Sequence, residues 1–194
     1  MLYRNATVDD IPKIETLQKK YHVSFISEED RKSGFVTTLF TSEQLTELIE
    51  TENGVALACD GDIIAAYAMA ASWEFWSKWP LFQFMIADLE NVTYAGQTLN
   101  TTNSYQYGPV CIDMTYRGQG VLNDLFQFSA RQMGKRYPIL ITFINHLNPR
   151  SFAAHTKKVG LDVIKDFTFN GNNYYELGYE TANASTEKSA GSPA

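Results

Sequence analysis

Cysteine and histidine are scarce in this chain. Its 194 residues include two cysteines and three histidines. Cys59 and Cys111 lie in separate apolar stretches without a C-x-x-C pair, and the histidines show no metal-ligand spacing. These patterns argue against a disulfide framework and against a zinc site. Because unpaired buried thiols suit a reducing compartment, we expect a cytoplasmic protein without a metal cofactor.

Long apolar runs and an excess of positive charge are also missing. No hydrophobic stretch approaches the length of a membrane-spanning helix, and the first ten residues contain no apolar signal segment. The chain has 16 Lys and Arg against 22 Asp and Glu, a net charge of −6. Nucleic acids are bound mainly through basic surfaces. We therefore expect neither a membrane nor a nucleic acid as partner, whereas a cationic amine would be attracted weakly.

The composition is that of one globular domain followed by a tail. Apolar residues make up 44% and charged residues 20% of the chain, which is typical of a soluble protein with a proper core. We expect this domain to span residues 1–181. Residues 182–194 are small and polar without apolar periodicity, so they predict a disordered C-terminal tail.

A strand, a glycine turn, a helix and a second strand follow one another between residues 107 and 161. The apolar runs 110–114 and 139–144 predict the two strands. The turn Arg117-Gly118-Gln119-Gly120 leads directly into the helix, whose first N–H groups have no acceptor within the helix. Because the helix dipole favours an anion and the glycines carry no Cβ, the turn predicts a phosphate or pyrophosphate site. The apolar face of the helix recurs at Leu122, Leu125, Phe126, Ser129 and Met133.

Two common phosphate motifs do not fit this turn. A dinucleotide-binding G-x-G-x-x-G motif would need a third glycine where Asn123 stands, and a P-loop needs a G-K-[ST] ending that is absent. A nucleotide-dependent oxidoreductase is therefore disfavoured.

The turn instead resembles the coenzyme A site of the GNAT family of acyl-CoA N-acyltransferases. The family signature [Q/R]-x-x-G-x-[G/A] corresponds to the six residues from Arg117 to Leu122, where a leucine replaces the final small residue. Downstream, the chain has one residue more than the family pattern between His155 and Gly160. Leu161 replaces the phenylalanine that follows this glycine in the family. The resemblance is specific over residues 108–161, and downstream it rests on Asn148, Ser151, His155, Gly160 and Leu161.

The resemblance implies a fold and a co-substrate. The fold would be α/β (α+β), with a mixed, mostly antiparallel sheet of about seven strands, flanking helices, and a splay between the fourth and fifth strands. Acetyl-CoA would enter that splay, and Gly108-Pro109 is typical of the bulge that opens it. Its pyrophosphate would bind Arg117, Gly118, Gln119, Gly120, Val121 and Leu122. Its pantetheine arm would lie along the main chain of Val110, Cys111 and Ile112, beside Asn148 and Ser151.

The implied reaction is direct transfer of an acetyl group to a primary amine of a small molecule or peptide. His155 would stand beside the CoA sulfur, where it would donate a proton to the leaving thiolate or only pack against the cofactor. An N–H from Cys111 or Ile112 would meet the oxyanion. The general base stays open among Glu74, Asp88, Glu90 and a water chain. The alternative function is a non-catalytic acyl-CoA sensor or regulatory module with the same fold.

All three tryptophans lie within residues 73–84. This aromatic segment would form either part of a core or homodimer interface, or one wall of the acceptor pocket. In the second case Trp73 and Glu74 are the candidate substrate residues, because an aromatic face attracts a cationic amine by about 0.5–2 kcal/mol. Glu74 could equally be a charge on an exposed strand.

The remaining pattern predicts ordinary secondary structure. Thr7 and Ser42 are the expected N-caps of two helices, the first ending near Tyr21. Residues 55–59 and 63–71 predict a hairpin with a turn at Asp60-Gly61, and the alanines of its second strand suit close helix packing. Strands are also expected at residues 2–5, 161–169 and 174–179.

Overall fold

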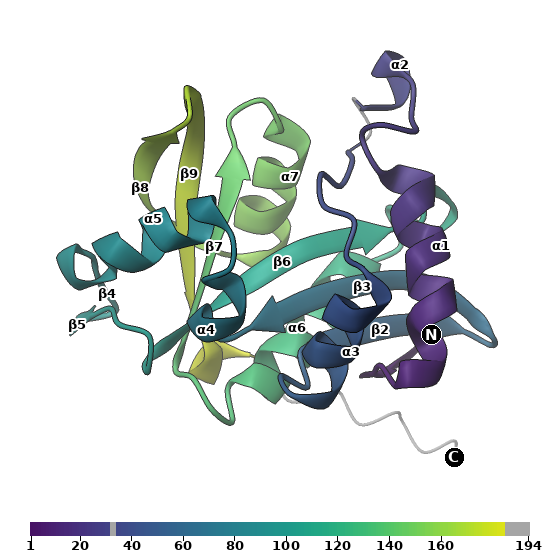
Figure 1. Ribbon diagram of the computed structural model, residues 1–194, viewed down its shortest axis with the longest axis horizontal. Helices are drawn as coiled ribbons and strands as arrows, with labels where there is room; N and C mark the ends of the chain where they lie inside the picture. The colour runs from purple at the N-terminus through teal and green to yellow at the C-terminus, as the bar shows by residue number, and fades with distance from the viewer. Residues whose placement is uncertain (32–33, 185–194) are drawn as a thin grey trace, which may run out of the picture.

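The computed structural model, which describes residues 1–31 and 34–184, is built on a seven-stranded mixed sheet (Figure 1). Neighbouring strands are antiparallel except β6 and β7, which run parallel. This arrangement confirms the expected α/β fold. The order across the sheet is β1 (Leu2–Asn5), β2 (Val55–Asp60), β3 (Ile63–Ala71), β6 (Ser104–Ile112), β7 (Ile139–Asn145), β9 (Asn172–Glu180) and β8 (Asp162–Phe169).

Helices cover both faces of this sheet. In Figure 1 the near face carries α1 (Ile11–Tyr21), α3 (Ser42–Glu50), α4 (Trp73–Trp76) and α5 (Pro80–Asp88). The far face carries α6 (Val121–Met133) and α7 (Pro149–Ala153), which continues as the π-helix η4 (Ala154–Val159). The remaining short elements are α2 (Glu28–Arg31), η1 (Val8–Asp10), η2 (Leu89–Asn91), η3 (Met114–Tyr116), η5 (Thr181–Asn183), and a small hairpin of β4 (Thr93–Tyr94) and β5 (Gln97–Thr98).

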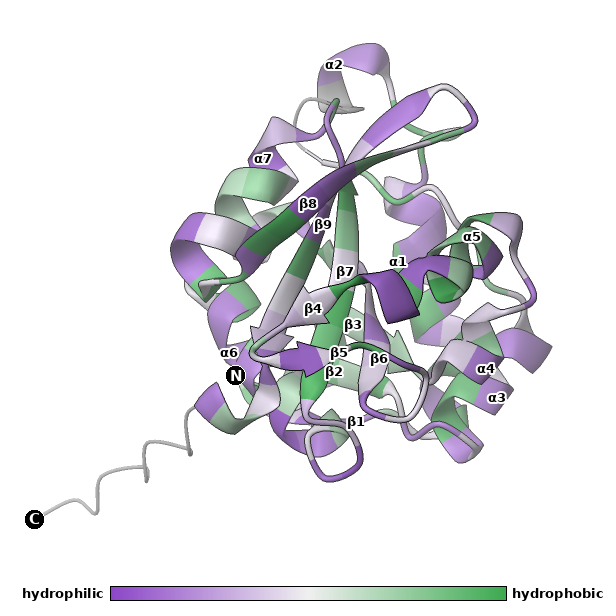
Figure 2. Ribbon diagram, turned by 90° about the vertical axis from the view of Figure 1, so that its left-hand side faces the viewer, coloured by the Kyte–Doolittle hydropathy of each residue, from purple (hydrophilic) through white to green (hydrophobic). Residues whose placement is uncertain are grey.

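Strand β3 shows how the two hydrophobic layers are divided. Its side chains alternate between the faces, as in any strand. Tyr67 and Met69 join the cluster under α1 and α3, whereas Ala66, Ala68 and Ala70 join the cluster under α6. The alanines therefore permit the close helix packing that their size predicts. Figure 2 shows the central strand β7 as predominantly hydrophobic, while much of the outer surface of the helices is hydrophilic.

The N-terminal helix begins after Thr7, as expected, through the turn η1. Helix α3 begins one residue earlier than predicted. Thr41, not Ser42, is its N-cap: Thr41 Oγ1 accepts from the Gln44 N–H at 3.3 Å, and Gln44 Oε1 accepts from the Thr41 N–H at 2.9 Å. This reciprocal pair requires a Gln or Glu three residues after the cap. Gln44 stands three residues after Thr41, so Thr41 is the N-cap of this helix where Ser42 was expected.

The sheet opens between β6 and β7, its fourth and fifth strands. These strands pair only where Ser104–Gln106 meets Ile139–Ile141. The next β6 carbonyl, that of Tyr107, accepts hydrogen bonds from Thr142 Oγ1 and Gln106 Nε2, both at 2.7 Å. A bulge at Gly108-Pro109 then shifts the register with β3. The expected splay and bulge are confirmed.

The aromatic segment forms helices α4 and α5, so Glu74 lies on a helix and not on an exposed strand. Strands β4 and β5 follow as a hairpin that the sequence did not predict. At the C-terminus, η5 ends the described chain. Residues 185–194, most of the expected tail, lie outside the described residues. Within the described ranges, no helix combines the length and hydrophobicity needed to cross a membrane.

Candidate functional site

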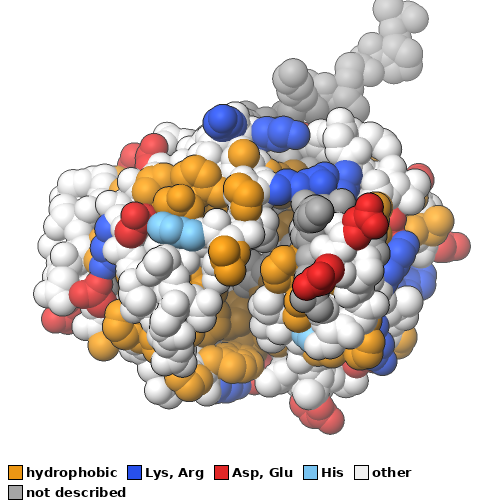
Figure 3. Space-filling view, turned by 90° about the horizontal axis from the view of Figure 1, so that it is seen from above, with side chains coloured by type: hydrophobic (Ala, Val, Ile, Leu, Met, Phe, Trp, Pro, Cys, Tyr) orange, Lys and Arg blue, Asp and Glu red, His pale blue; other side chains and the backbone are white. Residues whose placement is uncertain are grey.

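A cavity of about 450 Å³ lies where β6 and β7 diverge. Its walls are the end of α1, the segment 34–36, the glycine turn before α6, and the helix pair α7–η4. Figure 3 shows the upper face of the molecule hollowed at its centre, with hydrophobic side chains inside the hollow and Lys and Arg side chains along one rim. All the predicted cofactor residues line the cavity except Gln119, whose Nε2 donates to the Thr115 carbonyl at 2.8 Å.

The glycine turn has the backbone that an anion site needs. Gly118 and Gly120 have φ of 81° and 85°, in the left-handed region that favours glycine. A Cβ at either position would meet no atom within 4 Å, so the space in front of the turn is open. Gly120 is the N-cap of α6 and has no side chain to cap it, which leaves the first N–H groups of the helix facing the cavity.

Strand β6 turns alternate main-chain groups into the splay. The Asp113 N–H donates to the Ala65 carbonyl on β3 at 2.9 Å. Because main-chain groups alternate in direction along a strand, Cys111 also points its N–H and C=O toward β3. Val110 and Ile112 therefore direct theirs toward the splay. Of the two expected oxyanion donors, Ile112 faces the cavity with its N–H and Cys111 does not.

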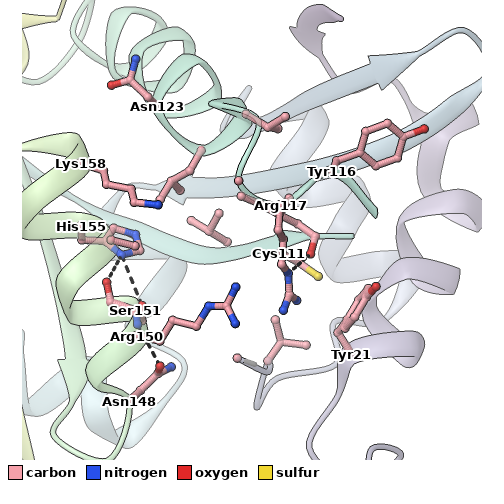
Figure 4. Close-up of a pocket in the computed structure, with 18 of the residues that line it drawn as sticks. Tyr21, Cys111, Tyr116, Arg117, Asn123, Asn148, Arg150, Ser151, His155 and Lys158 are labelled. Carbon is pink, nitrogen blue, oxygen red and sulfur yellow. Dashed lines mark hydrogen bonds between the residues drawn. The ribbon is translucent and has the colours of Figure 1, made fainter. Parts of the chain in front are cut away.

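Arg117 turns away from the glycine turn. Its Nε donates to the Ile112 carbonyl at 2.9 Å, and its guanidinium lies 5.1 Å from the centre of the Tyr21 ring. Burial lowers its pKa, as does the nearby positive charge of Arg150. Arg117 thus adds its charge to the wall formed by α1, away from the N-terminus of α6 (Figure 4).

His155 is held by the turn that precedes it. Asn148 caps α7 by accepting from the Ser151 N–H at 3.1 Å, and His155 Nδ1 lies 2.8 Å from the Ser151 carbonyl. A carbonyl only accepts, so Nδ1 carries the proton and Nε2 does not. Burial lowers the His155 pKa more than this hydrogen bond raises it, so the ring is neutral at pH 7.

The extra residue between His155 and Gly160 is accommodated by the π-helix η4. A π-turn holds one more residue than an α-turn. At the end of η4 the Gly160 N–H donates to the His155 carbonyl, five residues earlier, and Gly160 takes φ of 86° to end the helix; the Leu161 N–H donates to the same carbonyl at 3.0 Å. His155 and Lys158 both line the cavity from this segment.

The Cys111 side chain is buried on the near face of the sheet. Burial raises its pKa to about 12. A thiol with such a pKa carries almost no thiolate near neutral pH, and only the thiolate is a nucleophile. Cys111 is therefore a structural residue in this site.

Several cavity residues were not predicted from the sequence. Arg150 and Lys158 come from α7 and η4, and Tyr21 and the segment 34–36 come from the N-terminal part of the chain. Arg150 follows the Asn148-Pro149 cap and Lys158 lies two turns later, a spacing that could have indicated one basic helix face. No local sequence pattern indicated that Tyr21 and the segment 34–36 would line the cavity.

The expected substrate and base residues lie elsewhere. Trp73 is 1% exposed and its Nε1 donates to Ser104 Oγ at 2.9 Å, so it packs in the core beside α5. Glu74 is exposed on α4, and neither residue lines the cavity. Asp88 forms an ion pair with Lys165, and Glu90 is exposed.

The cavity has a cationic lining. Among the described residues, its lining contains Arg117, Arg150 and Lys158 but no carboxylate. The described part of the chain also contains no group of three or more His, Cys, Asp or Glu side chains placed to hold a metal ion. In a chain with a net charge of −6, Arg150 and Lys158 on one wall of the cavity favour an anionic ligand there.

Comparison with known proteins places this geometry in a fold family. No protein-family model and no curated protein matches the sequence. Solved structures do match. An acetyltransferase of the GNAT family from Listeria monocytogenes is 15% identical, with a TM-score of 0.62 over 92% of this chain and 94% of that one. The ribosomal-protein-alanine N-acetyltransferase of Brucella melitensis is 17% identical, with a TM-score of 0.60 over 93% and 99%.

A third structure, yncA of Salmonella typhimurium with its cofactor acetyl-CoA, is 10% identical, with a TM-score of 0.62 over 97% of this chain and 98% of that one. Identities this low establish the fold alone. Together with the sheet order, the splay at β6 and β7 and the glycine turn before α6, they show that the chain has the fold of the GNAT acyl-CoA N-acyltransferases.

Proposed function

We propose that the chain is an N-acetyltransferase, which transfers the acetyl group of acetyl-CoA directly to a primary amine of a small molecule or peptide. The observation that carries this proposal is the uncapped turn at Gly118 and Gly120, whose N–H groups face a cavity that continues along the splayed strands. Lys158 adds a positive charge on the facing wall. These features suit a long ligand with a pyrophosphate at one end.

The exposed edge of β6 suits the rest of such a ligand. Acetyl-CoA would supply a thioester: a C–N bond forms, the C–S bond breaks, CoA leaves as the thiol, and an acceptor that arrives as an ammonium ion loses one further proton to solvent. The Val110 main-chain groups would bind the pantetheine arm. The Ile112 N–H would face the oxygen on which negative charge develops. Asn148 and Ser151 would flank the arm from α7.

His155 would act through Nε2. Because the proton of the neutral ring lies on Nδ1, Nε2 can accept a proton from the amine or hold a water molecule, and it can give a proton to the thiolate only after taking one from the amine. This differs from the proton-donor role that the family resemblance implies. His155→Phe removes Nε2 and keeps an aromatic ring. We expect the substitution to lower turnover by about 10²-fold, the lower range for general acid–base catalysis.

Calorimetric titration with acetyl-CoA and with CoA tests the proposal. We expect micromolar dissociation constants for both, which a screen of primary amines for CoA thiol release would then extend to turnover. Failure of the wild-type protein to bind either compound at millimolar concentration would refute the proposal.

A second function, acyl-CoA sensing without turnover, is favoured by the absence of a carboxylate base among the described cavity residues. Both functions predict that acetyl-CoA binds in calorimetry, and they differ in whether an amine then causes release of the CoA thiol. A sensor would bind acetyl-CoA and release no thiol beyond the rate of spontaneous hydrolysis with any amine tested.

A further inference from the structure

The parallel ladder between β6 and β7 stops at one particular carbonyl. Near the start of the two strands, the Asn103 carbonyl accepts from the Ile139 N–H at 3.2 Å. Main-chain groups that face the same neighbour recur at every second residue of a strand. A ladder continued by four residues on each strand would therefore join the Tyr107 carbonyl to the Phe143 N–H. The register instead ends at Gln106, and the two strands then run apart (Figure 1).

Two side chains bind the Tyr107 carbonyl in place of the Phe143 N–H. Gln106 Nε2 and Thr142 Oγ1 both donate to this oxygen, each at 2.7 Å. A carbonyl oxygen has two lone pairs, so these two donors use its full capacity. Gln106 is 2% and Thr142 5% exposed, which shields both hydrogen bonds from competing water.

The two donors reach the carbonyl from opposite faces of the sheet. Gln106 lies on the near face, because Ser104, two residues earlier, accepts from a side chain of α4. Thr142 lies on the far face, since Leu140 and Ile144 on either side of it belong to the cluster under α6. Neither face of the sheet therefore leaves the carbonyl open to a further donor.

We infer that Gln106 and Thr142 form a clamp on the Tyr107 carbonyl, which stops the β6–β7 ladder and keeps the splay open for the coenzyme. Gln106 is then a positioning residue of the coenzyme site, although it lies outside the described lining of the cavity. The inference rests on the proposed function and adds the residues that shape its binding site. Because the clamp keeps β7 away, the main-chain groups of Val110 and Ile112 stay available to a ligand.

Hydrogen exchange in the free protein tests the clamp without any ligand. Gln106→Met and Thr142→Val each remove one donor and nearly preserve the size of the side chain. In the double variant the Tyr107 carbonyl is free to accept from the Phe143 N–H. We expect exchange of the Phe143 amide to slow at least about 10-fold relative to that of Ile144, which lies in the β7–β9 ladder.

The exchange ratio separates a closing splay from a general loss of stability. Loosening of the whole fold would speed both amides, whereas closure of the splay slows Phe143 alone. Should the double variant not fold, each single variant should slow Phe143 relative to Ile144 in the same direction. An unchanged or faster Phe143 amide relative to Ile144 would overturn the inference, because the bulge at Gly108-Pro109 would then hold the strands apart without the clamp.

Calorimetric titration with CoA tests the positioning role. We expect each single variant to weaken binding about 3–10-fold and the double variant more than either, because a closed splay must reopen. Gln18→Met is the matched control: Gln18 is 1% exposed, and its amide is bonded to the Phe40 main chain away from the splay. It should lose stability in urea unfolding and keep the CoA affinity and exchange ratio of the wild type.

Two binding results would overturn the positioning role. The first is unchanged CoA affinity in the double variant, and the second is an equal loss of affinity in Gln18→Met. A wild-type protein that binds no CoA would instead refute the proposed function. The exchange ratio needs no ligand, so it would still decide whether the clamp keeps β6 and β7 apart.

Discussion

Replacing Gly120 by alanine tests whether the glycine turn is a ligand site. At φ of 85° an alanine costs about 1–2 kcal/mol relative to glycine, so the free energy of unfolding should fall by that amount. In a domain of this size, each kcal/mol lowers Tm by roughly 2–4 °C. The new Cβ meets no protein atom within 4 Å, so no further loss of stability is expected. It does occupy the space from which an anion would reach the α6 N–H groups.

Acetyl-CoA affinity should therefore fall as well as stability. We expect Gly120→Ala to weaken binding in calorimetry by at least 10-fold, which corresponds to about 1.4 kcal/mol. Gly171→Ala is the matched control: Gly171 has φ of 74° and open space around its Cβ position, and it lies in the β8–β9 turn outside the cavity. It should lose similar stability in urea unfolding and keep full affinity. Unchanged affinity in Gly120→Ala would refute the assignment of the pyrophosphate to this turn.

Three further predictions concern single side chains. Both cysteines should resist a thiol reagent in the native protein at pH 8 and react on unfolding, because both are buried. Burial raises the pKa of the Cys59 thiol, and it raises that of Cys111 to about 12. Rapid labelling of one native thiol would contradict this. Arg4 holds the Asp10 pKa at about 2, below the ordinary 3.8. Asp10→Asn should therefore cost about 1–2 kcal/mol in chemical unfolding at pH 7, a difference that shrinks as pH falls toward 2 and would be constant with pH if the ion pair contributed nothing. Thr142→Val removes the hydroxyl that donates to the Tyr107 carbonyl on β6 at the start of the splay. It should weaken acetyl-CoA binding about 3–10-fold, whereas Thr142→Ser should not. Equal binding by both variants would exclude a role for this contact.

The local parts of the fold could be predicted from the sequence because their causes are local. Gly118 and Gly120 stand where φ is positive, and Pro109 stands at a bulge, so each residue type indicates the backbone conformation at its own position. The alanines of β3 indicated the close approach of α6. Strands β4 and β5 have two residues each, too few for any periodicity, and they were missed.

The site was predictable along one wall only. The β6 strand, the glycine turn and the start of α7 lie within the stretch whose pattern was specific, and the structure brings them around one cavity. Tyr21 reaches the same cavity from about ninety residues earlier in the chain, through a tertiary contact that no local pattern encodes. Trp73 shows the converse limit: composition places an aromatic residue inside the protein, but it does not distinguish a core from a pocket.

The short pairing between β6 and β7 has a consequence for how the molecule opens. Three residue pairs join two half-sheets, and beyond them the backbone ladder is interrupted while α6 packs beneath both halves. Free energies of local opening vary across a fold, and amides near such an interrupted ladder should exchange hydrogen through smaller openings than those of the β2–β3 ladder. A ligand lying in the splay would connect the half-sheets and oppose those openings, by about 2.7 kcal/mol at a ligand concentration 100 times its Kd. A bound ligand would thus link the two half-sheets reversibly, and its departure would restore the smaller openings beside the splay.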